Sequence, residues 1–526
     1  MGAPIENRSP LIGELIKTYP KPSDDEIKDV IRKAREEFLL WSQIPLTKRL
    51  KLIGDLRRLI ISQIDEIVDL LRLVTGKTRV EALINEIFPT LDAIRFYEKQ
   101  AASILKPHIT RNPVTYPNCV FSSEYHPLGV VLILSPWNFP FQLSLIPVVT
   151  ALAAGNSVVL KPSEVTPQIG EFIFDLVCEA GFPSDLVQVI YGDGETVEQF
   201  IEAQPDFIFM TGSTSTGKKI MGAAANCLIP VLLELGGKDP MIVFEDANLE
   251  RAANGAVYGA FANAGQVCVS VERVYVQDSI YEAFAHRVAE KARSLRVGST
   301  DDDDIGAITS PRQLEIIKNH IEDARDKGAI LMTEFAIDRC FIKPVVLRNV
   351  NHTMKIMREE TFGPTLPLMP FQTEEEAIRL ANDSPYGLNA SIWTRDLIKA
   401  RRVGSRLLTG GCAINDVLKN IGNPRLPFGG IKQSGLGRYH GAEGLRAFSR
   451  QMSVMVNKGQ MVRELNWFPY SSELYYNLKN FIRFLFGEWG QWPGWLNLFQ
   501  TFRYFRGILK DRPPRNAGKT EREHND

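Results

Sequence analysis

The 526-residue chain is poor in cysteine, in net charge and in long apolar runs. Its six cysteines stand far apart without a CxxC pair, which excludes a disulfide scaffold and indicates a reducing compartment. The 61 basic and 62 acidic residues give a formal net charge of −1, so no overall field favours a nucleic-acid partner. No run of about 18 uncharged apolar residues predicts a spanning helix, and the N-terminus lacks a secretory signal pattern. We therefore expect a cytoplasmic protein without a metal site.

The order of sequence patterns predicts an α/β fold. Residues 24–107 carry aliphatic side chains at three- and four-residue spacing, which predicts amphipathic helices. Short β-branched runs follow, at 129–135, 157–161, 187–191, 207–211 and 230–235, and then at 240–244, 272–276 and 391–394. Because helix-like segments separate these runs, they predict parallel sheets with crossover helices. We expect two α/β domains, the second beginning near Gly236, that face each other across a cleft.

Three motifs place reactive side chains at predicted strand ends. Cys268 lies between a helical run and a strand in FANAGQVCVSVERVYV, Glu234 ends a strand in LELGGKDP, and Asn138 follows one in SPWNFP. Each has an ordinary explanation by itself: a buried thiol, a solvated carboxylate and a turn asparagine. Together, a thiol, a carboxylate and an amide donor are the parts of a nucleophilic acyl-transfer site.

Two other strand ends carry signals for anion binding. KPSE (161–164) ends the second run, and FMTGSTSTG (209–217) ends the fourth, where backbone amides at the start of a helix bind anions. Lys161 and Glu164 are suited to ribose hydroxyls or a phosphate, and are equally compatible with ordinary surface charges. GSTSTG lacks the full GxGxxG spacing, so it is a weak dinucleotide signal.

Seven motifs together resemble one family. SPWNFP, KPSE, TGSTSTG, ELGGKDP, GQVCVSVERV, EETFGPTLP and PFGGIKQSGLGR occur in the order found in the aldehyde dehydrogenase superfamily, over roughly residues 10–458. The separation of 268 − 234 = 34 residues between Glu234 and Cys268 is similar to the family's spacing. The resemblance implies a Rossmann-like NAD(P)-binding domain (1–106 and 128–235) and a catalytic domain (236–440). It also implies oligomerisation strands (107–127 and 449–458), followed by an aromatic extension (459–526).

The resemblance also implies roles for individual residues. Cys268 is the expected nucleophile, Glu234 the general base, and Asn138 with the Cys268 backbone amide the oxyanion hole. Trp137 and Phe139 are expected to border the aldehyde tunnel. The expected cofactor-binding residues are Trp137, Lys161, Ser163, Glu164, Gly212, Ser213, Gly217, Leu235, Glu360 and Phe362. We expect NAD as the preferred cofactor, with NADP tolerated, and a homodimer or homotetramer.

The subfamily signals point in two directions. Tyr439 and His440 stand where many members carry a glutamate thought to relay protons, and 414–430 with GRYHG resemble the class 3 branch, which often takes long aliphatic or aromatic aldehydes. GQVCVSVERVYV and the C-terminal extension resemble some bacterial succinic semialdehyde dehydrogenases. We expect NAD(P)-dependent oxidation of a fatty, isoprenoid or aromatic aldehyde, with succinic semialdehyde as the alternative.

A nonenzymatic binding protein and a cofactor-free thiol hydrolase are rival classes. The complete set of thiol, base and amide donor argues against a nonenzymatic binding protein. The EETFGP and KPSE motifs argue against a cofactor-free thiol hydrolase, which would have no use for them.

The C-terminal extension is unusually aromatic. Between residues 467 and 505, 15 of 39 positions are aromatic, about 38% against 9% for the whole chain. Its charges recur too often for a spanning helix, yet its apolar surface is too large to leave in water. Two interpretations stay open: its helices pack on the body or on a partner subunit, or they lie peripherally in a bilayer interface. In the second case the residues facing anionic lipid are Lys479, Arg483, Arg503, Arg506 and Lys510. Beyond Asp511 we predict a frayed tail.

Overall fold

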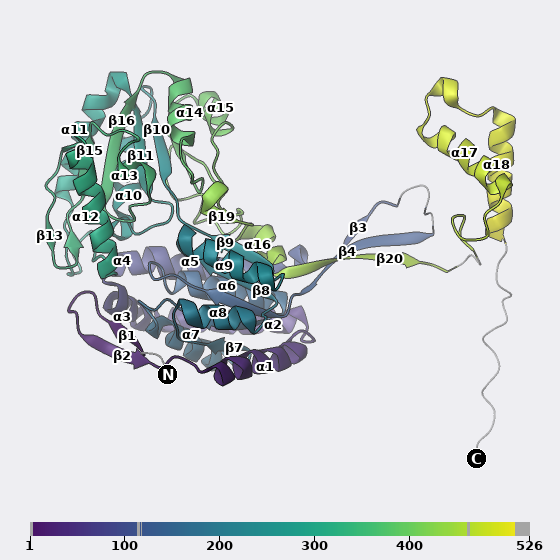
Figure 1. Cartoon of the computed structure of the whole chain (residues 1–526), viewed down its shortest axis with the longest axis horizontal. Coiled ribbons are helices and arrows are strands. Elements are labelled where there is room, and N and C mark those ends of the chain that lie inside the picture. Colours follow the sequence, from purple (N-terminus) through teal and green to yellow (C-terminus); the bar gives the residue numbers. More distant parts are fainter. Residues whose placement is uncertain (1–3, 113–115, 117, 460–462, 511–526) are drawn as a thin grey trace, which may run out of the picture. The chain divides into compact units, whose positions relative to one another are not determined.

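The computed structural model describes residues 4–112, 116, 118–459 and 463–510 (Figure 1). The predicted tail beyond Asp511 lies outside the described residues, and so does the side chain of Lys510. The chain divides into two compact units. The first comprises residues 1–106 and 125–451, and the second comprises 107–124 and 452–526.

The first unit opens with the predicted helices, which are confirmed. They follow a hairpin of β1 (Ile5–Arg8) and β2 (Leu15–Tyr19), and they are α1 (Asp24–Trp41), α2 (Leu46–Ser62), α3 (Ile64–Thr75), α4 (Arg79–Ala82) and α5 (Phe88–Ile104). Ser23 caps α1 in a capping box with Glu26, and Gly76 ends α3 with a left-handed φ of 74°. Between α4 and α5 runs a π-helical turn, η1 (Leu83–Ile87).

A six-stranded sheet forms the first lobe of this unit, in the order β19-β9-β8-β5-β6-β7. All strands but the two-residue β19 (Gly435–Leu436) run parallel, and they are β5 (Val130–Leu134), β6 (Ser157–Lys161), β7 (Val187–Val189), β8 (Phe207–Thr211) and β9 (Val231–Glu234). The connecting helices are α6 (Gln142–Ala154), α7 (Gln168–Glu179), α8 (Gly194–Glu202) and α9 (Thr214–Asn226). The five predicted parallel strands are confirmed, because buried strands of a parallel sheet read as continuous apolar runs.

A seven-stranded sheet forms the second lobe, in the order β12-β15-β16-β11-β10-β17-β18 (Figure 1). Its strands are β12 (Ile330–Leu331), β15 (Val345–Arg348), β16 (Thr365–Phe371), β11 (Val271–Gln277), β10 (Asp239–Val243), β17 (Ser391–Trp393) and β18 (Ala413–Ile414). A small hairpin, β13 (Ile337–Asp338) with β14 (Phe341–Ile342), belongs to the same stretch of chain. The helices of this lobe are α10 (Leu249–Phe261), α11 (Tyr281–Ser294), α12 (Pro311–Asp326), α13 (Lys355–Arg358), α14 (Glu374–Asn382) and α15 (Leu397–Gly404). Helix α16 (Gly441–Ala447) follows them in the chain but packs on α5 and α6 of the first lobe.

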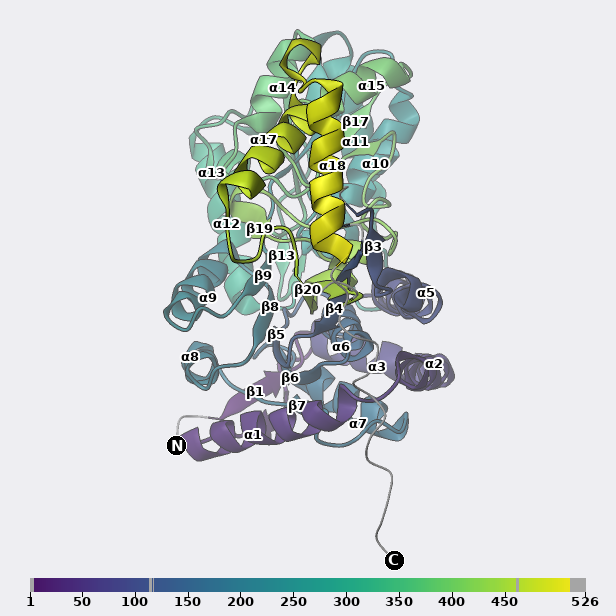
Figure 2. The same ribbon diagram turned by 90° about the vertical axis from the view of Figure 1, so that its right-hand side faces the viewer.

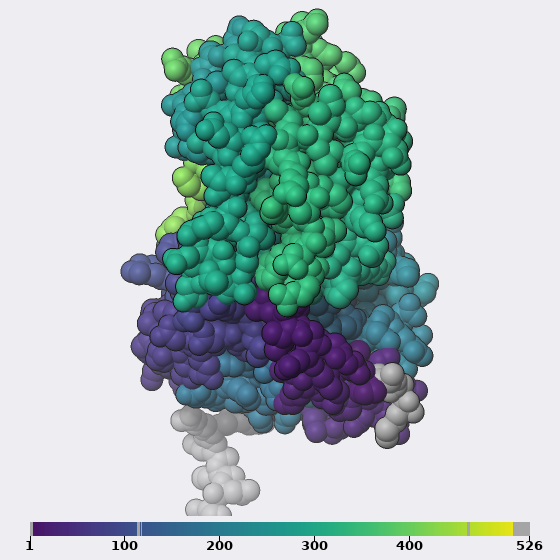
Figure 3. Space-filling view, turned by 90° about the vertical axis from the view of Figure 1, so that its left-hand side faces the viewer, coloured from purple at the N-terminus to yellow at the C-terminus, as the bar shows by residue number. Residues whose placement is uncertain are grey.

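The two lobes of the first unit are in direct contact. Figure 3 shows the dark purple N-terminal surface lying against the teal and green surface of the second lobe. Gly76 is part of this contact, because a Cβ there would lie 2.6 Å from the Cβ of Ala307 and 3.2 Å from Leu11. The backbone N–H of Ala307 also donates to the Gly76 carbonyl at 2.9 Å. These contacts hold the two lobes at a fixed distance from each other. The ends of both sheets can therefore line one cavity between the lobes.

The second unit contains a small sheet and a helical hairpin. Strands β3 (His108–Thr110), β4 (Cys119–Pro127) and β20 (Ser449–Asn457) form a sheet in the order β20-β4-β3. Helices α17 (Ser472–Phe486) and α18 (Trp495–Lys510) lie side by side (Figure 2) and share aromatic contacts such as Phe481–Phe505, with ring centroids 5.5 Å apart. Among the described residues, no helix is long and apolar enough to cross a bilayer.

Candidate active site

The carboxyl ends of β5, β8 and β9 and the segments just before β11 and β16 line one cavity of about 1190 Å³. In an open α/β sheet this edge is where ligands bind. Nine of the thirteen predicted site residues line this cavity: Trp137, Asn138, Gly212, Ser213, Glu234, Leu235, Cys268, Glu360 and Phe362. The other four, Lys161, Ser163, Glu164 and Gly217, are not part of its lining. Phe139 also lines the cavity.

Cys268 lies in a turn between the short 3₁₀ helix η2 (Ala262–Gly265) and β11. Asn263, Ala264 and Gly265 have φ values of 51°, 56° and 73°, so the chain bends sharply just before the thiol. Such strained backbone persists where surrounding structure enforces it, often at functional sites. Burial raises the pKa of the Cys268 thiol, and the nearby carboxylates, chiefly that of Glu360, raise it further. The thiol therefore needs a base to react.

Glu234 supplies a carboxylate at the end of β9. Its side chain is buried, and neither Oε1 nor Oε2 has a hydrogen-bond partner among the described residues. Burial raises the pKa of Glu234 well above its usual range, although Arg438 partly opposes this effect. A buried carboxylate with free oxygens and a raised pKa is suited to accept a proton.

Asn138 lies in the turn between β5 and α6, and its amide is already oriented. The side-chain Nδ2 donates to the carbonyl oxygen of Gln266 at 3.0 Å. Because a carboxamide nitrogen carries two N–H bonds, the second remains for a ligand in the cavity. The Asn138 backbone carbonyl accepts from Asn263 Nδ2 at 3.2 Å and from Lys77 Nζ at 2.9 Å.

The residues predicted to bind the cofactor fall into two groups. Ser213 caps α9, and its Oγ accepts from the Thr216 N–H, while a Cβ on Gly217 would lie 2.6 Å from Leu235. Lys161 Nζ and the Glu164 carboxylate form an ion pair at 2.9 Å beyond β6. Ser163 is buried beside them, and its Oγ accepts from the N–H of Val165 at 3.3 Å.

A buried ion pair holds the EETFGP segment. Lys238 Nζ contacts Glu272 and donates to Thr361 Oγ1 at 3.1 Å, while Glu272 accepts the backbone N–H groups of Thr361 at 2.8 Å and Phe362 at 3.0 Å. Glu360 Oε1 accepts from the Gly237 N–H at 3.1 Å, and burial with repulsion from Glu272 raises the pKa of Glu360 to about 8. These contacts fix the Glu360 carboxylate in the cavity. The sequence patterns predict neither Glu272 nor Lys238 as a site residue, although Lys238 belongs to the ELGGKDP motif.

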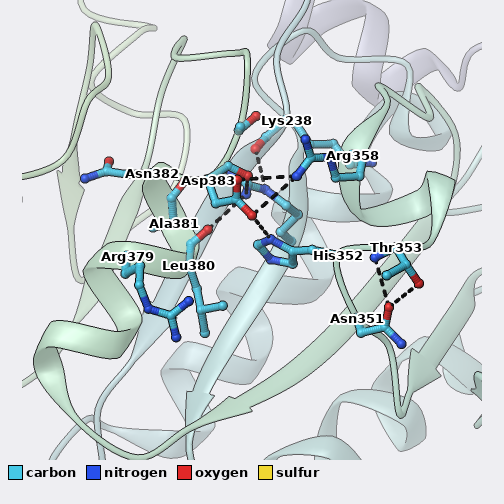
Figure 4. A network of polar contacts seen from close by, with 12 residues as sticks. Lys238, Asn351, His352, Thr353, Arg358, Arg379, Leu380, Ala381, Asn382 and Asp383 are labelled. Carbon is cyan, nitrogen blue, oxygen red and sulfur yellow. Dashed lines mark hydrogen bonds and ion pairs between the residues drawn. The ribbon is translucent and has the colours of Figure 1, made fainter.

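A second network fixes the residues just before Glu360 (Figure 4). His352 Nδ1 lies 2.6 Å from Asp383 Oδ2, and Arg358 Nη1 lies 3.3 Å from both oxygens of the same carboxylate. Buried Arg273 donates to the Lys238 carbonyl at 2.9 Å and to the Ala381 carbonyl at 3.0 Å. Through Arg273 this network contacts the ELGGK segment, and through Arg358 it contacts the residues just before EETFGP.

Tyr439 and His440 also line the cavity, on the side of Glu234. Both are buried, with ring centroids 4.3 Å apart, and the Tyr439 hydroxyl and both His440 nitrogens lack partners among the described residues. Burial lowers the pKa of His440 to about 4, so the ring is neutral at pH 7. A carboxylate relay at this position is replaced by two neutral rings.

Apolar side chains surround the opening of the cavity. Ile84, Phe88 and Tyr258 line it and are 54%, 68% and 49% exposed. Arg251 and Lys419 are the cationic side chains among the described lining residues, and both pair with Asp416, at 3.0 Å and 2.9 Å. The opening therefore favours an apolar molecule over an anionic one. The sequence patterns did not reveal this group of side chains.

A parallel sheet with a helix N-terminus at its carboxyl edge is an arrangement that binds dinucleotides, and here it lies beside a cavity with a thiol. The sequence model of the Aldehyde dehydrogenase family matches residues 2–454, and the chain belongs to this family. It is an NAD(P)-dependent oxidoreductase that acts on aldehydes.

Similar proteins cover most of the chain. A 4,4'-diapolycopene aldehyde oxidase of Methylomonas sp is 48% identical over 481 residues, 91% of each protein. A protein of Mycolicibacterium smegmatis, provisionally named succinate-semialdehyde dehydrogenase (NADP+), is 35% identical over 85% of this chain and 87% of its own length. The solved NAD-dependent aldehyde dehydrogenase of Sinorhizobium meliloti has a TM-score of 0.84 at 34% identity, covering 89% of this chain and 93% of that one. Betaine aldehyde dehydrogenase of Staphylococcus aureus, solved with NAD+, has a TM-score of 0.81 at 32% identity, covering 88% and 93%.

Proposed function

We propose that this enzyme oxidises a long apolar aldehyde, fatty, isoprenoid or aromatic, to its carboxylic acid through a thioester on Cys268. The observation that carries the proposal is one cavity that contains the Cys268 thiol, the unpartnered Glu234 carboxylate and the Asn138 amide behind an apolar opening. The name of the 48% identical relative, a diapolycopene aldehyde oxidase, supports an isoprenoid substrate.

The first lobe fits a nicotinamide dinucleotide, and we assign it to cofactor binding and the second lobe to catalysis. The first N–H groups of α9, next to Gly212 and Ser213, have no intrahelical acceptor and form a site for the pyrophosphate. Glu164 would accept hydrogen bonds from the adenosine ribose, and Glu360 from the nicotinamide ribose. When bound, the cofactor supplies the acceptor for a hydride. We expect NAD to be preferred, because the Glu164 carboxylate repels a 2′-phosphate.

The first half of the reaction forms a bond between Cys268 Sγ and the carbonyl carbon of the aldehyde. Glu234, directly or through water, takes the thiol proton, since burial raises the pKa of both groups. The substrate oxygen becomes an oxyanion, and the free N–H of Asn138 and the backbone N–H of Cys268 donate to it. In comparable sites one such donor contributes about 2.7–4 kcal/mol.

The second half of the reaction hydrolyses the thioester that remains after the substrate carbon is oxidised. After Glu234 has released the thiol proton to solvent, it takes a proton from a water molecule as the water oxygen bonds to the acyl carbon, and Cys268 leaves as a thiolate that regains a proton. Both Glu234 oxygens are free for this water. The product is a carboxylic acid rather than an acyl group passed to another thiol.

A panel of aldehydes tests the substrate class through the absorbance of NADH. We expect kcat/KM to rise from hexanal to dodecanal and farnesal, and to be low for succinic semialdehyde, because Arg251 and Lys419 are paired with Asp416. The variant Phe88→Ser is expected to lower kcat/KM for dodecanal about tenfold, which corresponds to about 1.4 kcal/mol, and to affect hexanal less. Leu397→Ser is the matched control, because Leu397 is exposed but lies outside the cavity lining. Preference for succinic semialdehyde would contradict the proposal.

The α17–α18 hairpin is a candidate for contact with a lipid surface, because it exposes large aromatic side chains while polar side chains are buried beside Leu474, Leu498 and Phe505. Asn477, Asn480 and Thr501 are buried in the hairpin, and Asn480 Nδ2 and Thr501 Oγ1 have no partner among the described residues. An unsatisfied buried group of this kind costs about 1–3 kcal/mol. Trp489 and Trp495, by contrast, are each 86% exposed.

The charge of the hairpin indicates which lipid it would meet. Helices α17 and α18 carry Lys479, Arg483, Arg503 and Arg506, against Glu473 in α17 and Glu488 beside η5 (Trp489–Gln491). Exposed tryptophans with nearby cations are typical of an element that lies at the headgroup level of an anionic membrane. We therefore propose peripheral binding to anionic lipid, where apolar aldehydes are concentrated.

Vesicle co-sedimentation tests this contact with the full chain. We expect binding to phosphatidylglycerol–phosphatidylcholine vesicles, weaker binding to phosphatidylcholine alone, and loss of binding in Trp489→Ser/Trp495→Ser. Phe88→Ser, an exposed aromatic change in the first unit, is the control that should sediment like the wild type. Equal sedimentation of the tryptophan variant would contradict lipid binding. Loss of oligomerisation in that variant would indicate that the hairpin packs on protein instead.

Assembly is proposed to use the β20 edge. Among the described strands, β20 pairs with β4 on one side only, and Met455 and Val456 are each 55% exposed. An open strand edge with apolar side chains is a template for a second chain. We expect a homodimer or a dimer of dimers by light scattering at micromolar concentration, and a monomer would contradict this proposal.

A further inference from the structure

A buried ion pair lies behind the turn that carries Asn138. Lys77 follows α3 directly, and Glu86 belongs to the π-helical turn η1. Their side chains are 1% and 0% exposed, and Lys77 Nζ lies 2.5 Å from Glu86 Oε1. Taking two charges out of water is expensive unless further hydrogen bonds satisfy them. The partners of the pair therefore indicate what it does.

Within the described part of the chain, the other hydrogen bonds of these two charged groups are made with residues 138–142, and Lys77 also attracts the buried carboxylate of Glu81. Lys77 Nζ donates to the backbone carbonyl of Asn138 at 2.9 Å and lies 4.6 Å from the ring centroid of Phe139. Glu86 Oε2 accepts the backbone N–H groups of Phe141 at 3.1 Å and Gln142 at 2.9 Å. The pair thus holds the middle and the end of the turn between β5 and α6.

This turn positions the amide that faces the cavity. With Lys77 and Asn263 on its carbonyl oxygen and Gln266 accepting from its Nδ2, Asn138 is fixed at both the backbone and the side chain. Phe139 packs with Val267, and partly buried Cys268 lies against the same cluster. A change in the turn would therefore move the amide relative to the thiol.

The π-helical turn explains how Glu86 reaches this position. Ile84 and Asn85 of the same turn line the cavity, whereas Glu86 points away from solvent toward the residues behind it. A π-helical turn widens the helix by one residue and occurs frequently at functional sites. One short segment therefore contributes both to the opening of the cavity and to the support of Asn138.

We propose that Lys77 and Glu86 are positioning residues that hold the Asn138 amide at the distance from Cys268 that oxyanion stabilisation requires. This inference rests on the proposed function, in which Asn138 donates to the oxyanion. An oxyanion donor is effective only if it is fixed in advance of the reaction, so a displacement of a fraction of an ångström lowers kcat rather than substrate binding.

A double-mutant cycle with Asn138 tests the inference. We expect Lys77→Met to lower kcat about 10- to 100-fold, with little change in the KM for the aldehyde or in the Kd for NAD, and Asn138→Ala to lower kcat about 10²- to 10³-fold. If Lys77 acts through Asn138, adding Lys77→Met to Asn138→Ala causes no further loss of kcat. If the loss of kcat in the double variant equals the product of the losses in the two single variants, the inference is overturned. An unchanged kcat in Lys77→Met also overturns it.

Two further variants separate positioning from folding. Because removing one partner leaves a buried charge, Lys77→Met/Glu86→Met, which removes both, is measured in the same cycle and is expected to give the same result. Arg57→Met breaks the 2.6 Å Arg57–Glu98 pair between α2 and α5 without touching residues 138–142, and should keep kcat unchanged. If Asn138→Ala alone leaves kcat unchanged, Asn138 is not the oxyanion donor and that part of the proposed function is wrong. This result differs from one in which both single variants lower kcat and the double variant shows the product of their losses.

Discussion

Replacing Glu234 with glutamine separates the two halves of the reaction. Glutamine has nearly the same shape but cannot take a proton, and neither carboxylate oxygen gives up a hydrogen bond within the described residues. A positioned general base contributes about 10²- to 10⁴-fold, which corresponds to about 2.7–5.5 kcal/mol of barrier. We therefore expect Glu234→Gln to lower steady-state kcat by this factor.

Rapid-mixing fluorescence of NADH is the assay for this variant. Glu234→Gln should slow thioester formation less than hydrolysis, because water can take the thiol proton in place of Glu234. A burst that approaches one NADH per active site is therefore expected, followed by slow turnover. The matched control is Asp239→Asn, because Asp239 is also buried with a raised pKa but lies outside the cavity lining. This control should show no burst and nearly normal turnover. Unchanged steady-state turnover in Glu234→Gln would refute the assignment of the base.

The same substitution has a consequence for stability. Burial raises the pKa of Glu234 in the folded chain above its value in the unfolded chain, so folding favours the protonated carboxyl. The free energy of unfolding is therefore highest at low pH and falls as pH rises through the folded pKa, because the buried group then becomes charged. Each pKa unit corresponds to about 1.4 kcal/mol. Glu234→Gln removes this penalty, so its melting temperature should exceed that of the wild type at pH 8, and the difference should shrink toward pH 5. A lower melting temperature at pH 8 would contradict this reasoning.

Three other substitutions test the cavity. Cys268→Ala is expected to abolish turnover and leave the Kd for NAD unchanged by calorimetry, because the thiol is the covalent centre; residual turnover near the wild-type rate would exclude it. The Glu360 carboxyl has a pKa of about 8, and its ionised form accepts hydrogen bonds better, so the Kd for NAD should fall as pH rises from 7 to 9; Glu360→Gln should remove that pH dependence. Glu164→Gln should raise kcat/KM for NADP relative to NAD about tenfold, because it removes a negative charge and frees Lys161 at 2.9 Å; an unchanged ratio would show that other residues select the cofactor.

The elements of this fold could largely be predicted from local patterns. All five residues of β5 and of β6 are buried, so β5 appears in the sequence as an uninterrupted apolar run and β6 as an apolar run between Ser157 and Lys161. Amphipathic spacing identified the helices before residue 107 for the same reason, since one face of each is buried. The short antiparallel β19 escaped prediction, because its pairing of Gly435 with Glu234 depends on a strand 200 residues away.

By itself the sequence determined the types of chemical groups and their order, because motifs such as ELGGKDP and GQVCVSVERV are contiguous in the chain. Only the tertiary structure decided how these groups are supported and charged. Lys77 meets a carbonyl 61 positions away, and Asn138 meets one 128 positions away, so no local pattern reports these contacts. The raised pKa of Glu234 arises from burial by segments distant in sequence. The exposure of Trp489 and Trp495 was not predicted either, because a helical repeat shows that a face is apolar but not whether that face is buried.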